Sequence, residues 1–364
     1  MDRRKFLSTT AVGAVAAGAL AAPAIAQGLP ELKWRMSSSF PKSLDTLFGG
    51  AESFAKRVAQ LTDNKFQIRV FAPGEIVPAL QNLDAVQNST IEMAHTASYY
   101  FVGKDPTFAF DTGVPFGLTP RQQNAWMSHG GGLRLMREFM ASYNVVPIPA
   151  GNTGTQMGGW FRKEIKTLDD VKGFKFRIAG MGGQIWAKLG AIPQQIAGGD
   201  IFAALERGTI DAAEWVGPYD DEKLGFVKVA PYYYYPGFWE GGAQLSIMVG
   251  KTLWEGLPPF YQHVLETAGA EVNLDTTARY DAVNPQALRR LVAAGAQLRP
   301  LSREIMAAAW KATHEIYDEI AAKNEKFKKV YEPWRAFRDE QFLWFRVAEL
   351  TYENFAFAAS QTVK

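Results

Sequence analysis

The chain contains no cysteine and only four histidines among its 364 residues. The absence of cysteine excludes a disulfide framework and thiolate chemistry, and so few histidines argue against a histidine-rich metal site. With 47% hydrophobic and 13% aromatic residues, the composition is that of a globular protein. A chain of this length can form two domains with substantial cores.

Long apolar runs are also missing, apart from one near the N-terminus. Residues 3–7 (RRKFL) precede a stretch rich in Ala, Gly and Val, and Ala24-Ile25-Ala26 forms a small-x-small cleavage signal. The run is too short and too rich in Ala and Gly to span a membrane. We therefore predict that residues 1–26 are an export signal and that the mature chain is periplasmic. The paired arginines favour twin-arginine export, with a Sec signal as the alternative.

An excess of charge of either sign is absent too. The whole chain has 39 basic and 37 acidic residues, and the predicted signal carries three basic and one acidic residue. The mature chain therefore has 36 of each and no net charge. A neutral exported protein has no basic surface for nucleic acid, so we expect no nucleic-acid partner.

The pattern along the mature chain predicts an α/β fold. Residues 32–37 (LKWRMS) and 66–71 (FQIRVF) alternate as strands do, and apolar residues over 44–61 have helical spacing. Strands that alternate with helices form parallel sheets, and such sheets bind ligands beyond the carboxyl ends of their strands. Residues 37–40 and 95–101 are therefore candidate edges of a site. His95 itself we expect to be a buried, hydrogen-bonded histidine.

Two glutamates mark the ends of a segment rich in tyrosine and tryptophan, residues 208–240. Glu214 precedes Trp215, and Glu240 follows Trp239. An aromatic wall with a few charges suits a small polar ligand, because it excludes water and fixes orientation. The alternative is that the aromatic residues fill a core and the glutamates lie on the surface, as most glutamates do.

Residues 171–180 (VKGFKFRIAG) and 189–215 (LGAIPQQIAGGDIFAALERGTIDAAEW) resemble the DctP-type solute receptors of TRAP transporters. The order of elements fits this family from about residue 34 to residue 359. Gly154-Thr155-Gln156 and Trp239-Glu240 are most similar to the branch that binds 2-oxo acids such as pyruvate. The resemblance implies a periplasmic receptor that delivers a small carboxylate to the transporter's membrane subunits.

The same resemblance implies a two-lobed fold with parallel-type sheets, hinge crossovers and long C-terminal helices. We expect lobe I to comprise residues 27–152 and about 242–285, and lobe II residues 153–241 and about 286–330. Residues 331–364 would then form a C-terminal helix with a possible role in dimer contacts.

Arg177 is the candidate for binding the ligand carboxylate, since it ends a predicted strand and its guanidinium can donate two parallel hydrogen bonds. A surface arginine paired with an acid is the alternative. The resemblance favours the ligand role and adds Gln156 and Trp215 as substrate-binding residues.

A charge count suggests a cation in the same site. Arg177, Glu214 and Glu240 together carry one net negative charge, and a monocarboxylate makes it two, which is costly to bury. Oxygen atoms of Gln156, Glu214, Glu240 and the Trp215 main chain would form a hard cage that suits Na⁺ or Ca²⁺. The resemblance supports a cation, with Na⁺ favoured. A glutamate that keeps its proton is the alternative.

Two other functions compete with this one. Two glutamates beside tryptophans could be the catalytic pair of a glycosidase, although no sugar-hydrolase motif, Gly-x-Ser-x-Gly motif or phosphate loop is evident. We expect no enzyme activity. An ABC-type carboxylate receptor would share the architecture and differ only in its membrane partner.

Helical spacing of aromatic residues predicts one long helix over residues 334–359. Its stripe is wider than one small lobe needs, because each buried aromatic side chain covers roughly 150–250 Å². We therefore expect a homodimer in which this helix contacts, or is exchanged with, a second copy. The alternative is a helix that braces both lobes of its own chain.

Overall fold

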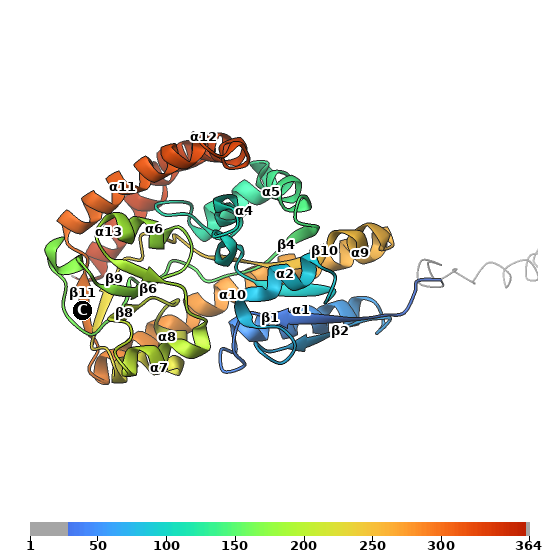
Figure 1. Cartoon of the computed structure of the whole chain (residues 1–364), viewed down its shortest axis with the longest axis horizontal. Coiled ribbons are helices and arrows are strands. Elements are labelled where there is room, and N and C mark those ends of the chain that lie inside the picture. The colour runs from blue at the N-terminus through green and yellow to red at the C-terminus, as the bar shows by residue number, and fades with distance from the viewer. Residues whose placement is uncertain (1–27, 362–364) are drawn as a thin grey trace, which may run out of the picture.

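The computed structural model describes residues 28–361, so the predicted export signal lies outside the described residues. Two β-sheets organise the chain (Figure 1). The first has the strand order β2-β1-β3-β10-β4, and the second β11-β9-β5-β8-β6-β7. We call the part built around the first sheet lobe I and the part built around the second lobe II. The predicted α/β, two-lobed fold is confirmed.

The strands of both sheets are short. They are β1 (Leu32–Ser38), β2 (Phe66–Phe71), β3 (Met93–Thr96), β4 (Val145–Asn152), β5 (Gly159–Phe161), β6 (Lys175–Arg177), β7 (Ile192–Gln194), β8 (Ala212–Ala213), β9 (Tyr232–Tyr235), β10 (Gln244–Gly250) and β11 (Gln297–Pro300). Both sheets are mixed rather than wholly parallel. β10 runs antiparallel to β3 and β4, and β5 runs antiparallel to β8 and β9. These two strands follow crossovers from the other lobe, so no helix reverses the chain before them.

The helices cover the sheets and join the lobes. They are α1 (Leu47–Leu61), α2 (Asn82–Gln87), α3 (Ala109–Thr112), α4 (Pro120–His129), α5 (Gly132–Ala141), α6 (Gly182–Lys188), α7 (Ile201–Glu206), α8 (Pro218–Leu224), α9 (Lys251–Gly256), α10 (Pro259–Ala293), α11 (Arg303–Ala321), α12 (Glu325–Val347) and α13 (Glu349–Ser360). α1 buries an apolar face, including Phe54 and Val58, as its periodicity predicts.

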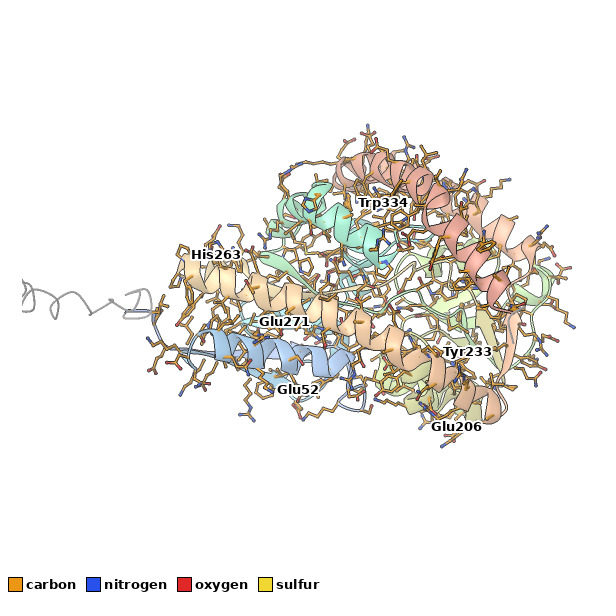
Figure 2. The ribbon with its side chains drawn as sticks, turned by 180° about the vertical axis from the view of Figure 1, so that it is seen from behind. Glu52, Glu206, Tyr233, His263, Glu271 and Trp334 are labelled. Atoms are coloured by element: carbon orange, nitrogen blue, oxygen red, sulfur yellow. The ribbon has the colours of Figure 1, made fainter. Side chains whose placement is uncertain are left out.

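Helix α10 runs from one lobe into the other and contacts elements of both (Figure 2). His263 and Glu271 mark its first half, which packs on β4 and α1 of lobe I, and its second half packs on α8 of lobe II. The helix continues to Ala293 with Pro285 inside it. Buried residues on both sides of Pro285, such as Tyr280 and Leu291, outweigh the one backbone hydrogen bond that proline removes.

The C-terminal helices pack on both lobes, α11 on α6 and α12 on α4 and α5. The prediction of a single helix over residues 334–359 is wrong at its start and in its middle, whereas its end agrees with that of α13 at Ser360. α12 begins at Glu325 and includes Pro333, and the helix breaks at Ala348 before α13 starts. Trp334 is buried in the core of this chain, whereas α13 has no buried residue. The aromatic stripe therefore divides into a buried part and an exposed part.

Candidate functional site

Arg177 and Glu214 meet because they leave neighbouring parallel strands at the same edge of the lobe II sheet. Arg177 ends β6, Glu214 follows β8, and these strands pair in parallel with Arg177 opposite Ala213. The Glu214 N–H donates to the Arg177 carbonyl at 3.1 Å. Polar side chains at the carboxyl ends of parallel strands gather in this way.

The Arg177 guanidinium is buried and already bound to protein acceptors. Its Nε donates to the Ile196 carbonyl at 3.0 Å, and Nη1 donates to the Glu214 carbonyl at 2.8 Å and to the Glu214 carboxylate. The guanidinium carbon lies 5.1 Å from the centre of the Trp215 ring. Burial disfavours the charged form, but the Glu214 carboxylate together with the Tyr100 and Tyr99 hydroxyls outweighs it, so the pKa of Arg177 is raised.

Gln156 and Glu240 come from the two segments that cross between the lobes. Gln156 follows β4, and Glu240 precedes β10. The Gly237 N–H donates to the Gln156 carbonyl at 3.1 Å, and the Glu240 N–H donates to the Gly237 carbonyl at 3.2 Å. A Cβ atom at Gly237 would lie 2.7 Å from the Met157 carbonyl oxygen, so glycine permits the crossovers to approach.

Three side chains of this cluster carry buried oxygen atoms without hydrogen-bond partners. Within residues 28–361, Gln156 Oε1, Glu214 Oε2 and both carboxylate oxygens of Glu240 lack a partner. All three side chains are buried. Unsatisfied buried polar atoms are rare and need an explanation. A bound hard cation would satisfy these four oxygens, so the residues present fit the cation that the sequence suggests.

The electrostatics of the cluster point the same way. Burial, followed by the neighbouring Glu214 carboxylate, raises the pKa of Glu240 well above its ordinary range. Burial also raises the pKa of Glu214, although Arg177 and the Ala179 N–H oppose that shift. One guanidinium therefore does not compensate two buried carboxylates. The site needs a proton or a cation to hold both.

A small cavity adjoins this cluster between the lobes. About 10 Å³ of it is free for the centre of a water-sized sphere, roughly what one water molecule needs. Gln156 and Trp215 form part of its wall, and Arg177, Glu214 and Glu240 lie behind that wall. The full lining comprises Phe40, Leu47, Ala97, Tyr99, Tyr100, Thr153, Gln156, Trp215, Val216, Ala243 and Leu245.

The predicted strand-end edges of lobe I do reach the cavity. Phe40 follows β1, and Tyr99 and Tyr100 follow β3. His95 is buried, as expected, and lies behind Phe40: its Nδ1 is 3.2 Å from the Ser38 hydroxyl, and burial lowers its pKa to about 3. The site is therefore closed from both lobes.

The structure brings together all five residues that the sequence singled out, Gln156, Arg177, Glu214, Trp215 and Glu240. It also shows lining residues that sequence reasoning missed, chiefly Leu47, Thr153 and Leu245. No local signal marks these three, because each lies in an ordinary apolar or turn context. Among the described residues, no group of three or more His, Asp or Glu side chains could hold a metal, so any cation here depends on amide or carbonyl oxygen as well.

A receptor that closes two lobes over a small polar ligand is the class that this fold and site define. Residues 37–324 match the family of bacterial extracellular solute-binding proteins, family 7, known as DctP. The chain belongs to this family. Proteins of this family are extracellular solute-binding proteins, which agrees with the predicted periplasmic location. No helix of residues 28–361 is long and apolar enough to cross a membrane.

Individual relatives are similar over nearly their whole length. The monocarboxylate 2-oxoacid-binding periplasmic protein of a Nostoc species is 53% identical, over 98% of this chain and 99% of that protein. A TRAP transporter solute-binding protein from Bordetella bronchiseptica is 52% identical, with a TM-score of 0.91 over 92% of this chain and 100% of its own. That protein was solved as a mixed-occupancy dimer with copurified calcium and picolinate in one site.

A third similar structure comes from Pseudoalteromonas atlantica. It is a TRAP periplasmic solute-binding protein with bound sodium and pyruvate. It is 36% identical to this chain, with a TM-score of 0.86, and the match covers 89% of this chain and 99% of its own. These matches favour the TRAP class over the ABC-type alternative.

Proposed function

We propose that this protein binds a small 2-oxo monocarboxylate, such as pyruvate, together with a metal cation, and delivers it to the membrane subunits of a TRAP transporter. The observation that carries the proposal is the set of buried, unpaired oxygens of Gln156, Glu214 and Glu240 beside a buried arginine. Relatives that hold sodium with pyruvate, or calcium with picolinate, support it.

Each residue has a distinct role in this proposal. Gln156 Oε1, the carboxylates of Glu214 and Glu240 and the Trp215 main-chain carbonyl would hold the cation. The cation would supply the positive charge that Arg177 alone does not provide. Arg177 uses Nε and Nη1 for the Ile196 and Glu214 acceptors and also interacts with the Tyr100 hydroxyl, and we assign the guanidinium to the ligand carboxylate at its side facing Tyr100. Trp215 fixes the guanidinium from one face.

The ligand class follows from the cavity wall. The lining residues include no cationic side chain, and Arg177, which lies over the lining residue Trp215, is already engaged by Glu214. The lining side chains are apolar or uncharged, so a second carboxylate would be buried without a cationic partner. A monocarboxylate with a short side chain satisfies this arrangement, and a dicarboxylate does not. Na⁺ is the favoured cation and Ca²⁺ the alternative.

We assign the protein a receptor role without turnover, and we place the hinge where the chain crosses between lobes, near residues 152–153, near 241–242 and within α10. Calorimetry with chelated, dialysed protein tests the function. Pyruvate should bind in the presence of Na⁺ or Ca²⁺, bind weakly without them, and be recovered unchanged. Binding that is indifferent to metal would favour a protonated glutamate, and conversion of the ligand would show an enzyme.

We further propose a homodimer formed through the C-terminal end of the chain. α13 has no buried residue, and its large apolar side chains are mostly exposed, with Phe355 77% and Tyr352 74% accessible. Solvent exposure of so many aromatic side chains on one short helix marks an interaction surface. The dimer of the Bordetella bronchiseptica relative supports a second copy as the partner.

A further inference from the structure

The Thr153 hydroxyl lies at the first residue after β4, where the chain leaves lobe I. It is buried and lines the cavity. Its oxygen takes part in three hydrogen bonds. It donates to the Gly154 carbonyl at 2.9 Å, and it accepts from the Ala243 N–H at 3.1 Å and from Gln156 Nε2 at 3.0 Å.

These three bonds use the whole capacity of a hydroxyl, which has one proton and two lone pairs. The proton goes to Gly154, and one lone pair receives the Ala243 N–H. The remaining lone pair needs a donor, and Gln156 Nε2 provides it. If the Gln156 amide turned over, the hydroxyl would have to turn its proton to the amide oxygen, and its bond to the Gly154 carbonyl would be lost. The hydrogen bonds at Thr153 therefore favour one orientation of this amide.

The consequence appears at the other end of the same amide. With Nε2 held by Thr153, Gln156 Oε1 points away from it, buried and without a partner among the described residues. An amide nitrogen in that position could not bind a cation, because it carries two protons and no available lone pair.

We propose that Thr153 is the positioning residue that presents the Gln156 amide oxygen to the cation. This inference rests on the proposed function, in which Gln156 is a cation ligand. Residues that orient a metal ligand through a hydrogen bond typically change metal affinity by roughly 10–100-fold when they are replaced. Thr153 would act through Gln156 and would not itself touch the ion.

The same hydroxyl makes this orientation depend on the hinge. The Thr153 N–H donates to the Ala243 carbonyl at 3.0 Å, while the Ala243 N–H donates to the Thr153 hydroxyl. The two crossovers are thus paired at the point that orients Gln156. If they separated, the hydroxyl would lose the Ala243 N–H that helps to hold it in place beside Gln156.

Substitution at Thr153 tests the proposal, with a matched control two residues away. Thr153→Val removes the hydroxyl at nearly constant shape, and Thr153→Ser keeps it. Thr155→Val is the control, since the Thr155 hydroxyl also bridges the crossovers, through Gly241 at 2.9 Å, but does not contact Gln156. We expect roughly 10–100-fold weaker Na⁺ or Ca²⁺ binding in Thr153→Val by calorimetry, and values near wild type in the other two.

A second measurement uses the metal-free protein. The Gln156 side-chain amide can be assigned in a ¹H–¹⁵N spectrum by its loss in Gln156→Glu. It should shift in Thr153→Val and remain in place in Thr155→Val and Thr153→Ser. Thr153→Ala replaces Thr153→Val if valine prevents folding.

The outcomes separate the two proposals. A wild-type protein that binds neither cation contradicts the proposed function and, with it, the role of Thr153. If the wild type binds the cation normally, the proposed function stands. The Thr153 assignment alone is then overturned if Thr153→Val and Thr155→Val have the same cation affinity and the same Gln156 amide signal.

Discussion

Asp45 of lobe I and Tyr219 of lobe II are joined across the cleft by a hydrogen bond of 3.0 Å. Asp45 immediately precedes the start of lobe I helix α1, and Tyr219 belongs to α8. The Asp45 carboxylate also pairs with Lys223 of α8 and, at 2.6 Å, with Arg279 of α10. Because the contacts to Tyr219 and Lys223 cross the cleft, they exist only while the lobes are closed.

Asp45→Asn should therefore weaken ligand binding without touching the ligand. Partly exposed ion pairs contribute about 0.2–1 kcal/mol each, so we expect a roughly 2–10-fold faster dissociation rate. The effect should shrink between about 0.05 M and about 1 M salt, because salt screens exposed charges. Stopped-flow fluorescence measures the dissociation rate at both salt concentrations. Glu255→Gln, which removes an ion pair within α9, is the control. Equal dissociation rates in both variants would contradict a role of the Asp45 contacts in holding the lobes closed.

Arg177→Lys should lose most of the affinity for pyruvate. Lysine keeps the charge but cannot reach the Ile196 carbonyl, the Glu214 carboxylate and a ligand from one planar group. Loss of one charged hydrogen bond costs about 1.5–3 kcal/mol, which corresponds to roughly 10–150-fold in affinity. Calorimetry on variant protein with a native circular dichroism spectrum is the test. Undiminished affinity would remove Arg177 from the ligand site.

Glu240→Gln should abolish the dependence of binding on added cation. The substitution removes one of two buried negative charges that a single guanidinium does not compensate. Thermal-shift titration of pyruvate with and without Na⁺ or Ca²⁺ measures this, because a ligand that binds only the folded state raises the melting temperature. A variant that responds to cations like the wild type would exclude Glu240 as a cation ligand.

Asp220 provides a pH dependence of stability through a buried carboxyl group. Burial raises its pKa from 3.8 to about 7, and its carboxylate accepts a 2.7 Å hydrogen bond from Tyr280. A carboxyl group with a raised pKa contributes stability that is fully present below pH 3.8 and is lost as the pH rises through about 7.

Asp220→Asn should remove this part of the pH dependence. We expect the melting temperature of the wild type to fall more than that of the variant between about pH 5 and about pH 8. Scanning calorimetry of both proteins in matched buffers gives the comparison. Parallel curves would show that Asp220 is ionised to the same extent in the folded and unfolded chains.

Removal of residues 348–364 should convert a dimer into a monomer that still binds ligand. A cut at residue 334 would fail as a test, because Trp334 lies in the core of this chain, packed near Phe110 and Tyr317. Light scattering at micromolar concentration measures the mass. A wild-type monomer, or a truncated dimer, would contradict an interface made by α13.

The sequence could predict Arg177 and Glu214 because both lie within one short stretch of strands and helices. Two parallel strands that end in polar residues place those residues at one sheet edge, whatever the rest of the chain does. Gln156 and Glu240 could not be found in this way. They lie on crossovers whose meeting depends on both lobes. Glu240 was a candidate because it follows Trp239 at the end of an aromatic segment, and the family resemblance added Gln156.

Hydrogen-bond direction and distant pairing lie beyond the reach of sequence patterns. The role of Thr153 depends on which neighbours donate and which accept, and Asp45 meets Lys223 across 178 positions in the chain. The break at Ala348 has no glycine or proline to announce it, whereas Pro285 and Pro333 lie inside helices. Tertiary packing decided these cases against local preference.

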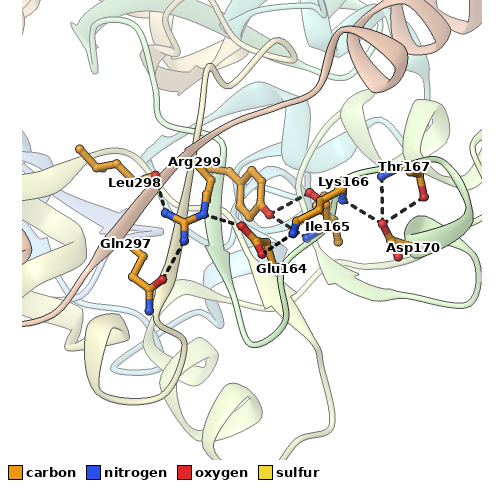
Figure 3. A network of polar contacts seen from close by, with 9 residues as sticks. Glu164, Ile165, Lys166, Thr167, Asp170, Gln297, Leu298 and Arg299 are labelled. Carbon is orange, nitrogen blue, oxygen red and sulfur yellow. Dashed lines mark hydrogen bonds and ion pairs between the residues drawn. The ribbon is translucent and has the colours of Figure 1, made fainter.

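A network of polar contacts at the edge of lobe II joins segments that are distant in the sequence (Figure 3). Arg299 of β11 bridges Glu164, Gln297 and the Leu298 carbonyl, while Asp170 accepts hydrogen bonds from Lys166 and Thr167. This network ties a loop near residue 165 to a strand near residue 298. Lobe II is therefore completed by chain that follows the ligand-binding segment.

The position of β10 between β3 and β4 has a consequence for synthesis. β3 and β4 are translated early, yet the strand that pairs with both arrives only with residues 244–250. Until then each presents an open edge, and open edges pair with other chains. Contacts between distant segments also slow folding. A nascent or truncated chain that ends before Gln244 should therefore aggregate rather than form lobe I, and productive folding must await most of the polypeptide.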